Sequence, residues 1–233
     1  KTWGWVKYSR RMGTLYLVRH GQASFGADDY DQLSALGHKQ SHQLGRYFGN
    51  RKLSFDAVLT GTLRRHTQTL DCICEGMGTE LAAKQWPALN EYDSLAVIAA
   101  VHPEPLQRPD SPELYRHHFR LLRAGLTQWM LGRVQPDGMP TWNQFQQGVV
   151  DVLTQVRQSG AHNVLLVSSG GPIATAIGHV LATPAEATVE LNMRLRNSSV
   201  TEFAFTPKRH ALQTFNTLPH LDALEFSDWI THA

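Results

Sequence analysis

The sequence is poor in cysteine: its 233 residues include only Cys72 and Cys74, which are separated by a single position. With no other cysteine to pair with, we interpret both as reduced thiols, as is typical of cytosolic proteins. A metal site built on Cys-x-Cys would need further soft ligands nearby, and we expect none. We therefore predict a cytoplasmic protein without a disulfide framework or a cysteine-bound metal.

Long apolar runs are also missing. No run reaches the ~18 residues that a membrane-spanning helix needs. The first residues, 1–6, lack the apolar core of a secretory signal peptide. We expect no membrane partner, and we expect residues 1–11 to be an N-terminal extension that precedes a domain starting at Met12.

Charge is scarce as well, because only 18% of the residues are charged and the formal net charge is +2. Lysine and arginine form no long basic stripe, which argues against a nucleic-acid partner. The most basic local run, at positions 7–11, lies outside the predicted domain. Hydrophobic residues make up 42% of the chain, so the sequence can bury a sizeable core.

Short apolar segments alternate with helical patterns along most of the chain, which predicts an α/β fold: a three-layer sandwich with a mainly parallel central sheet. Strands are expected near 15–18, 55–59, 81–85 and 163–168, with a final pair at 199–205 and 212–215. Helices are expected at 34–49, 62–75, 111–131, 141–158 and 173–181, the second capped by Thr62. We predict one domain over 12–233, in which a proline-rich insertion at about 86–140 could roof a site.

Three strand-to-helix junctions carry the chemistry. Arg19 and His20 follow the first strand, Arg65 follows the second, and Ser169 begins a glycine turn after Ser168. Such junctions gather at one edge of a parallel sheet, where helix N-termini favour anions. Guanidinium groups, an imidazole and a glycine turn together predict a phosphoryl pocket.

At these residues the sequence resembles the histidine phosphatase superfamily, which includes the cofactor-dependent phosphoglycerate mutases. The resemblance rests on five segments that span most of the chain. The segment at 30–40 is similar to the family's "D-x-L-T-x-x-G-x-x-Q", and the segment at 63–69 is similar to its "L-x-R-A-x-Q-T". The other three segments are Val18-Arg19-His20-Gly21, Leu89-Asn90-Glu91 and the run 167–173, which resembles the family's "S-H-G-G" junction.

The resemblance implies a two-step mechanism. His20 would attack phosphorus to form a phosphohistidine, while Arg19 and Arg65 would hold the phosphoryl oxygens. Glu91 would protonate the leaving alkoxide and then activate water, which requires burial to raise its pKa. The expected substrate-binding residues are Gln22, Ser169, Gly170 and Gly171, with no metal and no cofactor.

Three positions depart from the family pattern. Ser169 stands where the family's second histidine binds the phosphoryl group, Gly26 where many members have asparagine, and Gly61 where they have serine. Losing one charge-assisted hydrogen bond would cost about 1.5–3 kcal/mol. His220 could compensate if the C-terminal tail folded over the site, although we expect it on the surface.

We therefore predict a phosphomonoester hydrolase of the histidine acid phosphatase type acting on a small phosphorylated substrate. Two alternatives stay open. One is an isomerase of the phosphoglycerate mutase type, although positions 26–30 and 92–95 do not match its segments. The other is a weakly active or inactive family member that binds phosphorylated ligands, which the serine at position 169 motivates. A homodimer also stays open.

Overall fold

The computed structural model describes residues 12–24, 31–106 and 111–232. Its sheet has the strand order β3-β2-β4-β1-β5-β6. The first four strands in this order run parallel, whereas β5 is antiparallel to β1 and to β6. The strands are β1 (Gly13–Arg19), β2 (Ala57–Thr60), β3 (Lys84–Gln85), β4 (Asn163–Ser168), β5 (Val200–Phe205) and β6 (His210–Thr217). The α/β fold with a mostly parallel sheet is thus confirmed.

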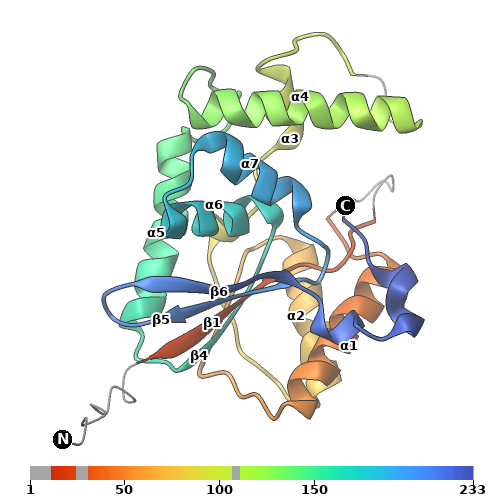
Figure 1. The fold of residues 1–233 in the computed structure, drawn as a ribbon, viewed down its shortest axis with the longest axis vertical. Helices are drawn as coiled ribbons and strands as arrows, with labels where there is room; N and C mark the ends of the chain where they lie inside the picture. Colours follow the sequence, from red (N-terminus) through yellow and green to blue (C-terminus); the bar gives the residue numbers. More distant parts are fainter. Residues whose placement is uncertain (1–11, 25–30, 107–110, 233) are drawn as a thin grey trace, which may run out of the picture.

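Helices cover both faces of the sheet, as Figure 1 shows. Side chains alternate across β1, so that Leu17 packs toward α5 and α6 while Val18 packs toward α1 and α2. Both residues are buried because a parallel sheet is covered on both faces. The covering helices are α1 (Ala35–Asn50) and α2 (Arg64–Met77) on one face, and α5 (Trp142–Gln158) and α6 (Gly170–Leu181) on the other.

Three further helices form a roof above the carboxyl ends of the parallel strands (Figure 1). They are α3 (Ser94–Ala99), α4 (Pro112–Met130) and α7 (Ala185–Arg194). The roof has its own core around Trp129, which contacts Val97 of α3 and Val189 of α7 through one apolar cluster. The helix expected in the insertion is confirmed, although the insertion's boundaries and the single-domain division stay a prediction.

Two local predictions are wrong. Thr62 does not cap α2, which begins after Leu63 without a side-chain cap; Thr62 instead exchanges two hydrogen bonds with the Asn90 side chain. The third strand spans only Lys84–Gln85, because it pairs with β2 over two positions at the sheet edge. In addition, α7 was not predicted, since its mixed pattern gives little helical periodicity. Short 3₁₀ turns complete the chain at Pro87–Leu89, Pro219–Leu221 and Leu224–Trp229.

Candidate active site

The site lies where β1, β2 and β4 end and α2 and α6 begin. His20 directly follows β1, Arg65 occupies the first turn of α2, and Ser169 is the N-cap residue of α6. The backbone N–H of His20 donates to the carbonyl of Ser168 (2.9 Å), which ties the first junction to the third. The parallel register of β1 and β4 therefore fixes these residues side by side.

The His20 ring is buried and has a defined proton arrangement. Its Nδ1 lies 2.7 Å from the Gly21 carbonyl oxygen, which can only accept, so Nδ1 carries the proton. The pKa of His20 is held well below its usual value by burial and then by the nearby charges of Arg19 and Arg65. The ring is consequently neutral near pH 7, and Nε2 keeps the lone pair of a nucleophile.

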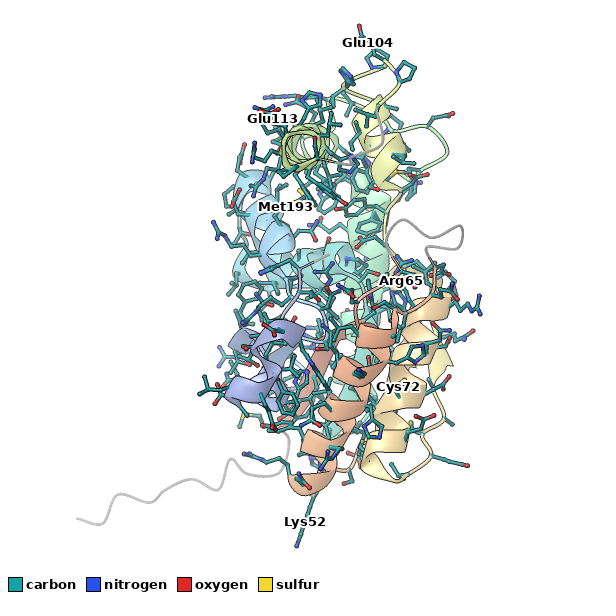
Figure 2. The ribbon with its side chains drawn as sticks, turned by 90° about the vertical axis from the view of Figure 1, so that its right-hand side faces the viewer. Lys52, Arg65, Cys72, Glu104, Glu113 and Met193 are labelled. Atoms are coloured by element: carbon teal, nitrogen blue, oxygen red, sulfur yellow. The ribbon has the colours of Figure 1, made fainter. Side chains whose placement is uncertain are left out.

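Two arginines line the same cavity as His20. The Arg65 guanidinium is paired with the carboxylate of Asp31 (Nη1–Oδ1, 2.8 Å), and the second oxygen of Asp31 accepts from the backbone N–H of Arg64. Asp31 thereby ties the start of α2 to the chain before α1. In Figure 2, Arg65 lies at the end of the sheet and its covering helices that faces the roof. Met193 lies between this end and α4.

Arg19 connects the site to the C-terminal segment. Its Nη1 donates to the backbone carbonyls of Leu195 and His232. The segment is held by Gln40, whose amide donates to Trp229 O (2.6 Å) and to Thr231 Oγ1 (3.0 Å). Residues at the end of the chain therefore form part of the cavity wall.

Glu91 sits against the start of α6. One of its carboxylate oxygens accepts from the backbone N–H of Gly171 (3.0 Å) and from that of Tyr92 (3.3 Å). Burial raises the pKa of Glu91, while the charges of Arg65 and Arg19 oppose this shift. A carboxyl group with a raised pKa, beside the nucleophile and two cations, is suited to act as a proton donor.

His66 is the polar residue beside the nucleophile to which sequence analysis gave no role. Its ring is completely buried, with its centroid 5.8 Å from that of His20. Its Nε2 lies 2.7 Å from Ser169 Oγ, so the serine that we predicted at the position of the family's second histidine has an imidazole partner. One sequence signal was available: His66 replaces the alanine of the "L-x-R-A-x-Q-T" pattern, next to the predicted Arg65.

Other predicted binding residues occupy different places. Gln22 does not line the cavity: its side-chain oxygen accepts from Ser34 Oγ (2.8 Å), and its backbone N–H donates to Gln40 (2.8 Å). Gly171 uses its N–H to hold Glu91, and a Cβ there would lie 2.2 Å from that carboxylate. Gly170 begins α6 against the side chain of Asn192. Gly26 lies outside the described residues.

The expected surface position of His220 is wrong. The side chain is 4% exposed and its Nε2 lies 2.9 Å from Ser198 Oγ. The 3₁₀ turn that carries His220 packs against α1 instead of covering the site. The tail residue that does line the cavity is His232, at the end of the described chain.

The cavity between the sheet edge and the roof has a volume of about 860 Å³. Arg19, His20, Arg65 and Glu91 form its polar floor. The wall residues are Leu63, Tyr92, Asp93, Ser94, Leu95, Tyr115, His118, Phe119, Leu122, Asn192, Met193, Thr231 and His232. The structure thus brings the four predicted catalytic residues together under one opening.

Within the described part of the chain, no group of three or more histidine, cysteine or acidic residues is arranged to hold a metal ion. Over the same residues, no helix combines the length and apolar character that crossing a membrane requires.

Comparisons with known proteins agree with this architecture. The family model for the histidine phosphatase superfamily (branch 1) matches residues 15–218. No curated protein sequence matches the chain.

Three solved structures are similar to this one. The alpha-ribazole phosphatase from Shigella flexneri has 20% sequence identity and a TM-score of 0.61, with 88% of this chain and 96% of that chain covered. The phosphoserine phosphatase from Entamoeba histolytica, in complex with 3-phosphoglyceric acid, has 17% identity and a TM-score of 0.62 (90% and 99% covered). The phosphoglycerate mutase from Bacillus anthracis str. Sterne has 18% identity and a TM-score of 0.63 (91% and 96% covered).

Proposed function

Because this chain belongs to the histidine phosphatase superfamily (branch 1), we propose that it hydrolyses phosphomonoesters through a phosphohistidine on His20. One observation carries the proposal: the neutral, Nδ1-protonated ring of His20 shares a single cavity with Arg19, Arg65 and Glu91. Solved structures with this fold include two phosphatases, which supports hydrolysis as the reaction class.

In the first step, Nε2 of His20 attacks phosphorus and the bond from phosphorus to the ester oxygen breaks. Protonated Glu91 gives its proton to that oxygen, so the product leaves as an alcohol. The two arginines stabilise the charge that spreads over the phosphoryl oxygens. The Gly21 carbonyl holds the Nδ1 proton of the phosphorylated ring.

In the second step, the Glu91 carboxylate accepts a proton from water, whose oxygen attacks phosphorus. The bond from phosphorus to Nε2 breaks, inorganic phosphate leaves, and His20 and protonated Glu91 are regenerated. The backbone N–H of Gly171 holds the carboxylate in place during both proton transfers. We propose that no metal takes part, because the two arginines supply the positive charge that Mg²⁺ provides in other phosphoryl-transfer sites.

The test is hydrolysis of p-nitrophenyl phosphate in H₂¹⁸O, with and without EDTA. We expect one ¹⁸O atom in the released phosphate, a trapped phosphoenzyme in samples quenched with SDS at alkaline pH, and the same rate in EDTA. Conversion of 3-phosphoglycerate to 2-phosphoglycerate without phosphate release would instead identify an isomerase. Binding of phosphate or vanadate without any turnover would identify a phospho-ligand-binding protein. Loss of activity in EDTA that a divalent ion restores would contradict the metal-free mechanism.

A further inference from the structure

The wall of the cavity differs chemically from its floor. Resting on the proposed function, we propose that the alcohol released from the substrate is bulky, apolar and uncharged, such as an arylalkyl group. The floor takes the phosphate, and the space under the roof takes the rest of the molecule.

Apolar and aromatic side chains make up seven of the thirteen wall residues among the described part of the chain. Leu95, Tyr115 and Phe119 line the cavity and are 64%, 37% and 38% exposed, respectively. The roof's own core does not cover them. That core instead closes around Trp129, which is 1% exposed. Large apolar groups left open in a concave site favour an apolar ligand.

Positive charge is confined to the floor. Among the described lining residues, the only arginines are Arg19 and Arg65, and no lysine lines the cavity. The wall histidines His118 and His232 have pKa values lowered by burial, and both are neutral near pH 7. Asp93 adds negative charge near the wall, where it caps α3 through the N–H groups of Leu95 and Ala96. Among the residues that the structure describes, a carboxylate or second phosphate on the leaving group would therefore find no cation in this wall.

Size supports the same conclusion, because pockets of 300–1,000 Å³ typically enclose drug-sized ligands. At about 860 Å³, the cavity is far larger than a phosphate group requires. A small polar ester would leave the apolar wall in contact with water, whereas an aromatic ring would displace that water.

Three phosphomonoesters of primary alcohols test this proposal: 2-phenylethyl phosphate, ethyl phosphate and phosphoserine. Their leaving groups are all primary alkoxides, so differences in kcat/KM report mainly on the wall. We expect 2-phenylethyl phosphate to exceed ethyl phosphate by at least about tenfold, and phosphoserine not to exceed ethyl phosphate. Phe119→Asp should lower the ratio of the first value to the ethyl phosphate value toward one.

The matched control is Leu224→Asp, which adds the same charge at an apolar residue that is 93% exposed outside the cavity. It should change none of the three values. Equal kcat/KM for all three esters, or a preference for phosphoserine, would overturn the apolar-substrate proposal while leaving hydrolysis intact. Absence of turnover with every ester would overturn the proposed function itself, and the substrate proposal with it.

A separate observation concerns His66, Ser169 and Gly61, which all differ from the family motifs. We infer that His66 is a positioning residue that, with Ser169, replaces the second histidine as the support beside His20. His66 stands where the motif has alanine, and Ser169 where it has histidine. The two side chains meet at 2.7 Å. A Cβ on Gly61, where the motif has serine, would lie 2.2 Å from His66 Nδ1.

The buried ring of His66 has one hydrogen-bonding arrangement that fits its surroundings. Burial lowers its pKa to about 3, so the ring is neutral near pH 7. Its Nδ1 has no hydrogen-bond partner among the described residues. An orphaned buried N–H is rarer than an orphaned acceptor, so the proton belongs on Nε2. Nε2–H then donates to Ser169 Oγ and leaves the serine hydroxyl proton available to another acceptor.

This geometry predicts what happens when the usual histidine is restored. Ser169→His alone should lower kcat, because the new imidazole would overlap the His66 ring. His66→Ala alone should lower kcat about tenfold with little change in KM. The double variant His66→Ala/Ser169→His should have a higher kcat than either single variant. His210→Ala removes a histidine from β6, away from the cavity, and should leave kcat unchanged.

Rescue by the double variant distinguishes a positioning role of His66 from a merely structural one. If the role were merely structural, the losses of kcat caused by the two substitutions would add in the double variant. A double variant no better than His66→Ala would overturn the inference. An increase in kcat for Ser169→His alone would also overturn it, since the ring of His66 would then not occupy the required space. Melting temperatures of all four variants show whether each protein is folded.

Discussion

The floor and the roof of the cavity differ in which side chains they bury and which they expose. In the floor, polar groups are buried: His20 is 4% exposed and Arg65 is 6% exposed. In the roof, apolar groups are exposed, as Leu95 and Phe119 show. Polar residues are usually exposed and large apolar residues are usually buried, so both regions depart from this preference. The floor buries polar groups where we propose that the phosphate binds, and the roof exposes apolar groups where we propose that the rest of the substrate binds.

The difference teaches how the two tasks are divided. The floor is held by the sheet register and by hydrogen bonds between distant segments, which fixes reacting atoms within a narrow range. The roof has its own core and presents side chains that can change without disturbing the strands. Substitutions in the floor should therefore change rates strongly, whereas substitutions in the roof should change substrate preference.

The largest effect is expected for His20→Ala, which removes the nucleophile from the floor. We expect kcat to fall by at least about 10³-fold, because the covalent step is lost. Circular dichroism should show an intact fold, and samples quenched with SDS at alkaline pH should contain no phosphoenzyme. Wild-type turnover by this variant would refute the mechanism.

A smaller effect is expected for Glu91→Gln, and it depends on the leaving group. The variant keeps the shape of the side chain but has no proton to give. We expect kcat/KM for an alkyl phosphate to fall by about 10²- to 10³-fold, and kcat/KM for p-nitrophenyl phosphate to fall much less, because kcat/KM reports the step in which the leaving group departs. Equal losses for both substrates would mean that Glu91 does not protonate the leaving group. In the wild type, activity should decline as pH rises through the raised pKa of Glu91.

Buried neutral histidines make the region below the site sensitive to acid. Burial lowers the pKa of His220 to about 3, whereas in the unfolded chain the value is about 6.5. Between these values the unfolded chain binds a proton that the folded chain does not, so stability decreases as pH falls from about 6.5 toward 3.

In His220→Gln, this contribution disappears. Below pH 6.5, the unfolding free energy of the variant should decrease with falling pH less steeply than that of the wild type, by about 1.4 kcal/mol per pH unit. Urea unfolding at a series of pH values measures the slope. Parallel curves for the two proteins would show that His220 does not titrate differently on unfolding.

The smallest effects are expected for two ion pairs, one in the floor and one in the roof. Asp31→Asn weakens the support of the buried Arg65 guanidinium and should lower kcat/KM about tenfold. Glu190→Gln breaks the roof pair with Arg123, in which both side chains are more than a third exposed. It should cost less than about 1 kcal/mol of stability and leave kcat/KM unchanged. A larger loss of activity from the roof variant would break the division between the regions.

Sequence patterns located the floor because its residues stand directly at strand ends. Arg19 is the last residue of β1 and His20 directly follows it, and the motif register selected Arg65, which lines the cavity, over Arg64. Glu91 was found through its place in the motif order. Their catalytic roles stay predictions, whereas their convergence in one cavity is a property of the structure.

The sequence by itself determined the alternation of strands and helices, the order of the junctions and the residues that stand at them, because all of these depend on neighbours along the chain. Tertiary structure alone decided that His66 meets Ser169, that Gln22 turns to Ser34 and Gln40, and that His232 lines the cavity while His220 is buried. Such contacts join residues as far apart as 103 positions, as for His66 and Ser169. No local pattern encodes a side chain's partner, because packing of the whole sheet and its helices sets which groups come within hydrogen-bonding distance.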